Sequence, residues 1–157
     1  MFFACMVYDL RNHQVPTPLT VGGMVGAGLY ALFNGLWAPV LLMIALTHVS
    51  DFNPREKRLA FALTLSAFTA IFQPSATLIC LLILVVWLLW EFGVLGGADV
   101  KLIIAAALVL GNPIFLIPIS IVGGVQGVIA SLQKKREIPF VVSIFCGTLL
   151  FVLYPYF

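Results

Sequence analysis

Two aspartates stand out in a chain that carries very few charged side chains. Asp99 lies where two long apolar tracts meet, shortly after Gly96 and Gly97. Asp9 lies near the start of the sequence, ahead of the first of these tracts. Ionisable groups are costly to hold at membrane depth, so aspartates in such surroundings are expected to serve a function. Asp9 and Asp99 are therefore a candidate pair.

Two carboxylates that share one proton can hydrolyse a peptide bond without a metal or a nucleophilic side chain. One takes a proton from water, and the other gives its proton to the carbonyl oxygen of the scissile bond. Two like charges held close together cannot both ionise cheaply, so their pKa values separate. Asp99 is predicted to open a helix, where the helix dipole favours the charged form, and Asp9 to end one. From this placement we expect Asp99 to act first as the base and Asp9 to carry the shared proton.

The composition of the chain is that of a membrane protein. Its 157 residues are 62% hydrophobic and 9% charged, and its mean hydropathy is +1.15. Globular chains carry about 25% charged residues. A chain of this length is expected to form a single domain over residues 1–157. Because it shows no basic face, we expect no nucleic-acid partner, and the lipid bilayer is its expected environment.

Three tracts without charge separate four charged clusters. Those at residues 59–90 and 102–133 would each be roughly 48 Å long as one straight helix, against an apolar bilayer core of about 30 Å. Each tract carries a breaker near its middle, of the kind that marks a turn. Each is therefore predicted to form a helical hairpin that leaves and returns to one side of the membrane. The breakers are Asn34-Gly35, Gln73-Pro74-Ser75 and Asn112-Pro113.

Such hairpins would gather every Lys and Arg on one face of the protein. An excess of Lys and Arg marks the cytoplasmic side, so Asp9 and Asp99 would both face the cytoplasm. The expected fold is all-α, a polytopic membrane helix bundle with about six to eight transmembrane segments. The predicted helices cover residues 19–33, 36–50, 59–72, 76–92, 99–111, 114–132 and 138–156, after a short first helix that ends at Asp9.

Four residues near Asp99 are candidates for supporting roles. Gly96 and Gly97 are expected to let the chain turn with positive φ and to let an extended substrate come close. Lys101 lies about 200° around a helix from Asp99, so it need not touch that carboxylate. Both snorkelling to the interface and tuning of the site stay open for Lys101. For Glu91, contact with a basic substrate segment and an interfacial position at a helix end both stay open.

Three short motifs span most of the chain. Residues 95–102 read LGGADVKL, residues 9–20 read DLRNHQVPTPLT, and residues 137–147 begin with EIPF and end with a glycine. In this order they resemble the three motifs of the type IV prepilin peptidase family, which includes the archaeal preflagellin peptidases. The departures are Ala98, in place of the second glycine of a GxGDxKL motif, and Thr17, where Asn or Asp is usual.

The resemblance implies a membrane aspartic endopeptidase in which Asp9 and Asp99 form the catalytic pair. The family cleaves the short basic leader from prepilin-like or preflagellin-like precursors at the cytoplasmic face of the cell membrane. The two aspartates lie farther apart than is typical, which implies an extra helical hairpin near residues 36–75. The chain has no Cys-x-x-Cys pair, so neither the N-methyltransferase activity of larger members nor a metal or other cofactor is expected. By the same resemblance, the supporting motif contains Gly96, Gly97 and Lys101.

Other classes of function stay open on the sequence alone. Intramembrane aspartates also bind protons and cations, so a small proton- or cation-coupled membrane transporter could use Asp9 and Asp99. Transporter sites, however, are expected near the membrane midplane between broken helices. A structural or assembly subunit without chemistry is a third class. A presenilin-type protease is a nearer rival, but its Pro-Ala-Leu element is missing and residues 100–102 (VKL) favour the prepilin peptidases.

Overall fold

Eight α-helices make up most of the described chain. The computed structural model describes residues 2–12, 16–49, 54–132 and 140–154. Within these ranges there is no strand, so the all-α prediction is confirmed for that part of the chain. Two short 3-10 turns, η1 (Pro74–Ala76) and η2 (Pro113–Phe115), precede α5 and α7. The helices are α1 (Phe2–Asn12), α2 (Thr17–Phe33), α3 (Trp37–Val49), α4 (Arg55–Phe72), α5 (Thr77–Glu91), α6 (Gly97–Leu110), α7 (Leu116–Leu132) and α8 (Phe140–Leu153).

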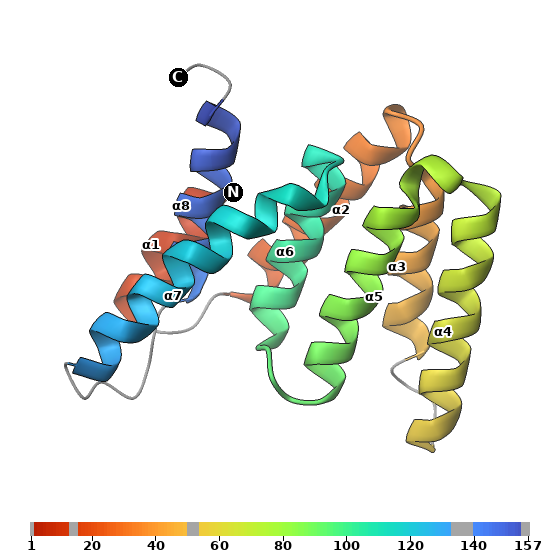
Figure 1. The fold of residues 1–157 in the computed structure, drawn as a ribbon, viewed down its shortest axis with the longest axis horizontal. Helices are drawn as coiled ribbons and strands as arrows, with labels where there is room; N and C mark the ends of the chain where they lie inside the picture. Colours follow the sequence, from red (N-terminus) through yellow and green to blue (C-terminus); the bar gives the residue numbers. More distant parts are fainter. Residues whose placement is uncertain (1, 13–15, 50–53, 133–139, 155–157) are drawn as a thin grey trace.

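The chain turns back at each of the three predicted breakers, although α7 packs against α8 and not against α6. The turns that join α2 to α3, α4 to α5 and α6 to α7 lie at one end of the bundle, and the turn from α5 to α6 lies at the other (Figure 1). The first and third turns contain glycines with positive φ, Gly35 at 78° and Gly111 at 63°. In the second, Gln73 ends α4. α2 begins at Thr17, ahead of the predicted start at residue 19, because a proline such as Pro18 is tolerated in a first helical turn.

Gln73 ties two of these turns together. Its side-chain amide donates a hydrogen bond to the carbonyl oxygen of Gly35 at 2.7 Å. Its side-chain oxygen accepts one from the backbone N–H of Ala38 at 3.0 Å. Both backbone groups lie at helix ends, where helical hydrogen-bond partners are missing. The α2–α3 hairpin is thereby joined to the α4–α5 hairpin.

α6 occupies the centre of the bundle. It packs against α2, α5 and α8, whereas α1 packs chiefly against α8. Every residue from Leu102 to Leu108 is buried, as expected for a helix that is apolar on all sides. α8 in turn packs closely against α7: a Cβ at Gly147 of α8 would lie 2.5 Å from the backbone of Ile119 of α7. Asp99 therefore lies in the first turn of a helix that is itself tightly packed at the centre of the bundle.

Much of the outer surface is apolar. Phe33, Ile71 and Leu132 are 91%, 74% and 81% exposed, and many other large apolar side chains are exposed with them. Soluble monomers rarely expose contiguous apolar patches of more than a few hundred Å². Within the described residues, one segment, Pro74–Glu91, is long and apolar enough to cross a membrane, and the other apolar helices are shorter. Exposed apolar surface of this kind marks a face that contacts either a membrane or another protein.

We expect Gln73→Ala to destabilise the bundle. The substitution removes both hydrogen bonds between the two hairpins and should cost about 1–3 kcal/mol. Thermal unfolding in detergent, followed by circular dichroism, should show a lower midpoint. Ser75→Ala, at an exposed position in the same turn, is the matched control. Equal midpoints for the two variants would contradict the role of Gln73.

Candidate active site

Asp99 lies in the first turn of α6, at the end of the bundle where α5 leads into α6 (Figure 1). The helix begins at Gly97, with Gly96 as its N-cap. The positive φ predicted for these glycines occurs instead at Gly93, whose φ is 73°, whereas Gly96 has a φ of −71°. That prediction was wrong, because the chain reverses directly after α5 ends and is already extended when it reaches Gly96.

Gly96 has a different role, which concerns the side chain of Asp99. A Cβ at Gly96 would lie 3.0 Å from Oδ2 of Asp99, closer than ordinary contact. The Asp99 carboxylate also accepts a hydrogen bond from the backbone of Gly96. An acidic residue in the first turn often reaches back in this way to the residue before its helix. The glycine leaves room for the carboxylate to fold back over the helix N-terminus.

Asp9 lies in the last turn of α1, which continues to Asn12 and does not end at Asp9 as predicted. The residue is only 8% exposed. Its charge raises the pKa of Asp99. Such an effect weakens quickly with distance and is screened by salt beyond about 10 Å. The structure therefore brings the two aspartates near one another at the same end of the bundle.

The Asp99 carboxyl is harder to ionise than its helix position suggested. It is followed directly by Val100, the first buried apolar residue of α6. Burial is the larger cause and the charge of Asp9 the second; together they raise the pKa of Asp99 to about 6, although the hydrogen bond from Gly96 lowers it. The loss of water and the nearby like charge thus raise this pKa by more than the helix N-terminus lowers it. Two interacting carboxyls titrate as a unit, so the raised pKa of Asp99 belongs to the pair and the division of roles between Asp9 and Asp99 stays a prediction.

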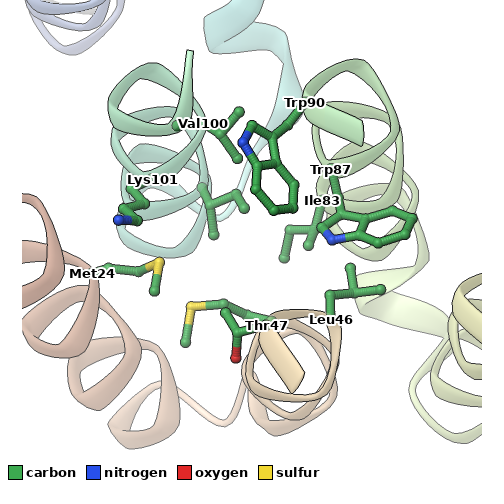
Figure 2. A pocket seen from close by; sticks show the side chains of 11 residues that line it. Met24, Leu46, Thr47, Ile83, Trp87, Trp90, Val100 and Lys101 are labelled. Atoms are coloured by element: carbon green, nitrogen blue, oxygen red, sulfur yellow. The ribbon is translucent and has the colours of Figure 1, made fainter. Parts of the chain in front are cut away.

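Lys101 lines a cavity of about 340 Å³ between α2, α3, α5 and α6 (Figure 2). Gly97 and Ile104 of the same helix line it too. These three positions share one side of a helix, and Asp99 lies about 200° from Gly97 around the axis. Within the described residues Lys101 makes no ion pair with Asp99. The lysine belongs to the cavity and not to the pair of aspartates.

Glu91 is held by two arginines. Its side chain is 6% exposed, and its Oε1 lies 2.7 Å from Nη2 of Arg58 and 3.6 Å from Nε of Arg55. Arg55 also donates a hydrogen bond to the carbonyl oxygen of Glu91 at 3.1 Å and lies over the ring of Phe92. A carboxylate buried to this degree needs such partners. Glu91 therefore fastens the end of α5 to the start of α4, and its carboxylate is not free for a basic substrate segment.

The described residues contain no group of three or more His, Cys, Asp or Glu side chains that could hold a metal ion. Cys5 and Cys80 are buried free thiols. His48 makes a hydrogen bond with the carbonyl oxygen of Ile44 in its own helix at 2.9 Å. His13 and residues 137–139 of the predicted C-terminal motif lie outside the described part of the chain.

No protein-family model, curated protein or solved structure matches this chain. Asp9 and Asp99 are thus a candidate catalytic pair by their placement at the same end of the bundle. The short motifs around them remain a resemblance in sequence.

The cavity beside α6 was not predicted from the sequence. Only its α6 wall has a sequence signal, which is the helical spacing of Gly97, Lys101 and Ile104. Thr47 of α3 and Trp90 of α5 complete the lining. They are far apart in the sequence, and nothing in their local patterns indicates that they meet.

We expect Gly96→Ala to raise the pKa of Asp99 above about 6. The added methyl group would displace the carboxylate and weaken the hydrogen bond that lowers this pKa. Infrared absorption of the protonated carboxyl, assigned with Asp99→Asn, follows the titration. Gly97→Ala is the control, because its Cβ would make only ordinary contact with Trp90, at 3.6 Å. Identical titrations for Gly96→Ala and the unaltered protein would contradict the proposed contact.

Proposed function

We propose that the chain is a membrane aspartic endopeptidase that cleaves the basic leader from prepilin-like precursors at the cytoplasmic membrane face. The reacting groups would be Asp9 and Asp99. One observation carries the proposal: a buried aspartate, Asp9, raises the pKa of a second, partly buried one at the same end of an apolar bundle. The class of substrate comes from the motif resemblance.

A polytopic membrane bundle of six to eight segments is part of this proposal. The apolar exterior and the return of each hairpin to one end support it. Helices of 13 to 18 residues, such as α3 and α4, extend roughly 20–27 Å. They would need a locally thinned bilayer, at a modest energetic cost. The end that carries Arg55, Glu91 and Asp99 would face the cytoplasm.

In the proposed reaction, Asp9 acts as the base and Asp99 as the acid. Ionised Asp9 takes a proton from water, and the water oxygen attacks the carbonyl carbon of the scissile amide. Asp99 gives its proton to the carbonyl oxygen, so a neutral gem-diol forms. The C–N bond then breaks as Asp9 passes its proton to the leaving nitrogen and a diol hydroxyl returns a proton to Asp99. Both carboxyl groups end in their starting states.

A small proton- or cation-coupled transporter is the second candidate. A carboxyl whose pKa is raised to about 6 can exchange a proton near neutral pH, which favours it. Against it, Asp99 lies in the first turn of a continuous helix at one end of the bundle. Transporter sites are expected near the midplane between broken helices. Uptake into proteoliposomes that requires Asp99, without precursor cleavage, would favour the transporter.

Co-expression with a tagged precursor that bears a basic leader and an apolar stem tests the peptidase. Asp9→Asn and Asp99→Asn should each reduce cleavage at least about 100-fold, because each removes half of the acid–base pair. Gel mobility reports loss of the leader, and fractionation reports membrane insertion. Glu56→Gln, at an exposed acidic residue of α4, should leave cleavage unchanged. Full cleavage by either inserted aspartate variant would exclude the pair.

The pH dependence of cleavage follows from the pKa of Asp99. The acid must hold a proton, so kcat/KM should fall about tenfold per pH unit once the pH exceeds the pKa of the free protein, which is about 6. A kcat/KM that rises through this pH and stays high would assign the role of base to Asp99.

Asp9→Asn allows the same pKa to be examined without any activity. The substitution removes the like charge, so infrared titration should show a lower pKa for Asp99 than in the unaltered protein. An unchanged pKa in Asp9→Asn would mean that the two carboxylates do not interact.

A further inference from the structure

The cavity beside α6 is lined mainly by apolar side chains. Its volume of about 340 Å³ falls in the range of small-molecule sites, roughly 300–1,000 Å³. Met43, Ile83 and Ile104 form its floor and are 6%, 0% and 5% exposed. Thr47 and Trp90 form its mouth and are exposed.

The mouth lies at the end of the bundle that carries the charged residues. Thr47 is near the end of α3, Trp90 is near the end of α5, and Gly97 starts α6. These helix ends lie at the same end of the bundle (Figure 1). In the membrane orientation proposed above, the mouth opens at the level of the lipid head groups and the floor lies in the hydrocarbon.

Lys101 is the only charged residue among those that line the cavity in the described chain. It lies on the α6 side, with Met24 of α2 beside it (Figure 2). No carboxylate of the described residues forms an ion pair with it. The indole of Trp90 also lines the cavity, with its Nε1 next to Gly97 at the start of α6. An apolar cavity with a cation and no acid in its lining is complementary to an apolar chain with an anionic head.

We propose that this cavity binds one acyl chain of an anionic phospholipid, whose phosphate pairs with Lys101. The acyl chain would fill the apolar floor without burying any polar group. The phosphate would supply the counter-charge for the ammonium group, which could also snorkel to the head-group level. An apolar peptide segment could fill the same volume but would leave Lys101 without a counter-charge.

The lipid site and the proposed peptidase site lie on different sides of α6. Lys101 and Ile104 are within about 40° of Gly97 around the helix axis, whereas Asp99 is about 200° from it. Lipid binding depends on the proposed membrane setting but not on the pair of aspartates. Asp9→Asn, which should abolish cleavage, is expected to leave lipid retention unchanged, so failure of one proposal is distinguishable from failure of the other.

Native mass spectrometry of the full chain, released from detergent micelles, measures how many lipids stay bound. We expect one phosphatidylglycerol per chain, and weaker retention of phosphatidylcholine with the same acyl chains. Lys101→Gln should weaken the retention of phosphatidylglycerol about fivefold, as expected for the loss of one lysine at a lipid surface. Ile104→Phe, which adds bulk to the floor, should weaken the retention of both lipids. Met43→Phe fills the same floor and replaces Ile104→Phe if that variant fails to fold.

Lys57→Gln is the matched control, because Lys57 is an exposed cation at the same end of the bundle that does not line the cavity. It should retain phosphatidylglycerol as the unaltered protein does. Equal losses for Lys101→Gln and Lys57→Gln would indicate a diffuse effect of surface charge and would overturn the site. Equal retention of the two lipids by the unaltered protein, or full retention by a folded floor variant, would overturn it as well.

Discussion

A charged group in an apolar bundle must reach water, find a partner of opposite charge or lose its charge. The charged residues of α5 and α6 differ in how they meet this constraint. Glu91 is paired with two arginines, and burial together with the charge of Asp9 raises the pKa of Asp99. Lys101 lies in a cavity that opens at the charged end of the bundle. The hairpins make this possible, since each returns the chain to that end.

α6 separates two kinds of chemistry although the residues concerned are almost adjacent. Asp99 and Lys101 are two positions apart, which puts them on different sides of a helix. On one side, the charge of Asp9 acts on the Asp99 carboxyl. On the other, Lys101 contributes to a cavity made with α2, α3 and α5. A motif that places both residues within one turn can therefore serve two sites, with the central helix as their common support.

The segment predicted as an extra hairpin contributes to both the framework and the cavity. It contains α3 and α4, and its status as an addition to the family pattern stays a prediction. Gln73 joins it to the α2–α3 turn at one end of the bundle, and Arg55 and Arg58 join it to Glu91 at the other. Thr47 and Met43 of α3 line the cavity. The proposed lipid site thus depends on this hairpin, whereas neither aspartate lies in it.

The sequence by itself determined the helical content, the hairpin turns and the common end of the bundle for Asp9 and Asp99. These follow from local signals, such as uncharged tracts too long for one span and Gly, Asn or Pro at their middles. Which glycine of the turn before α6 takes positive φ could not be read from the sequence, because any of the three can adopt it. Only the tertiary structure decided that the pKa of Asp99 is raised, that Glu91 is held by arginines and that Lys101 faces a cavity. Burial and charge–charge interactions depend on side chains that are far apart along the chain, and packing alone brings them together.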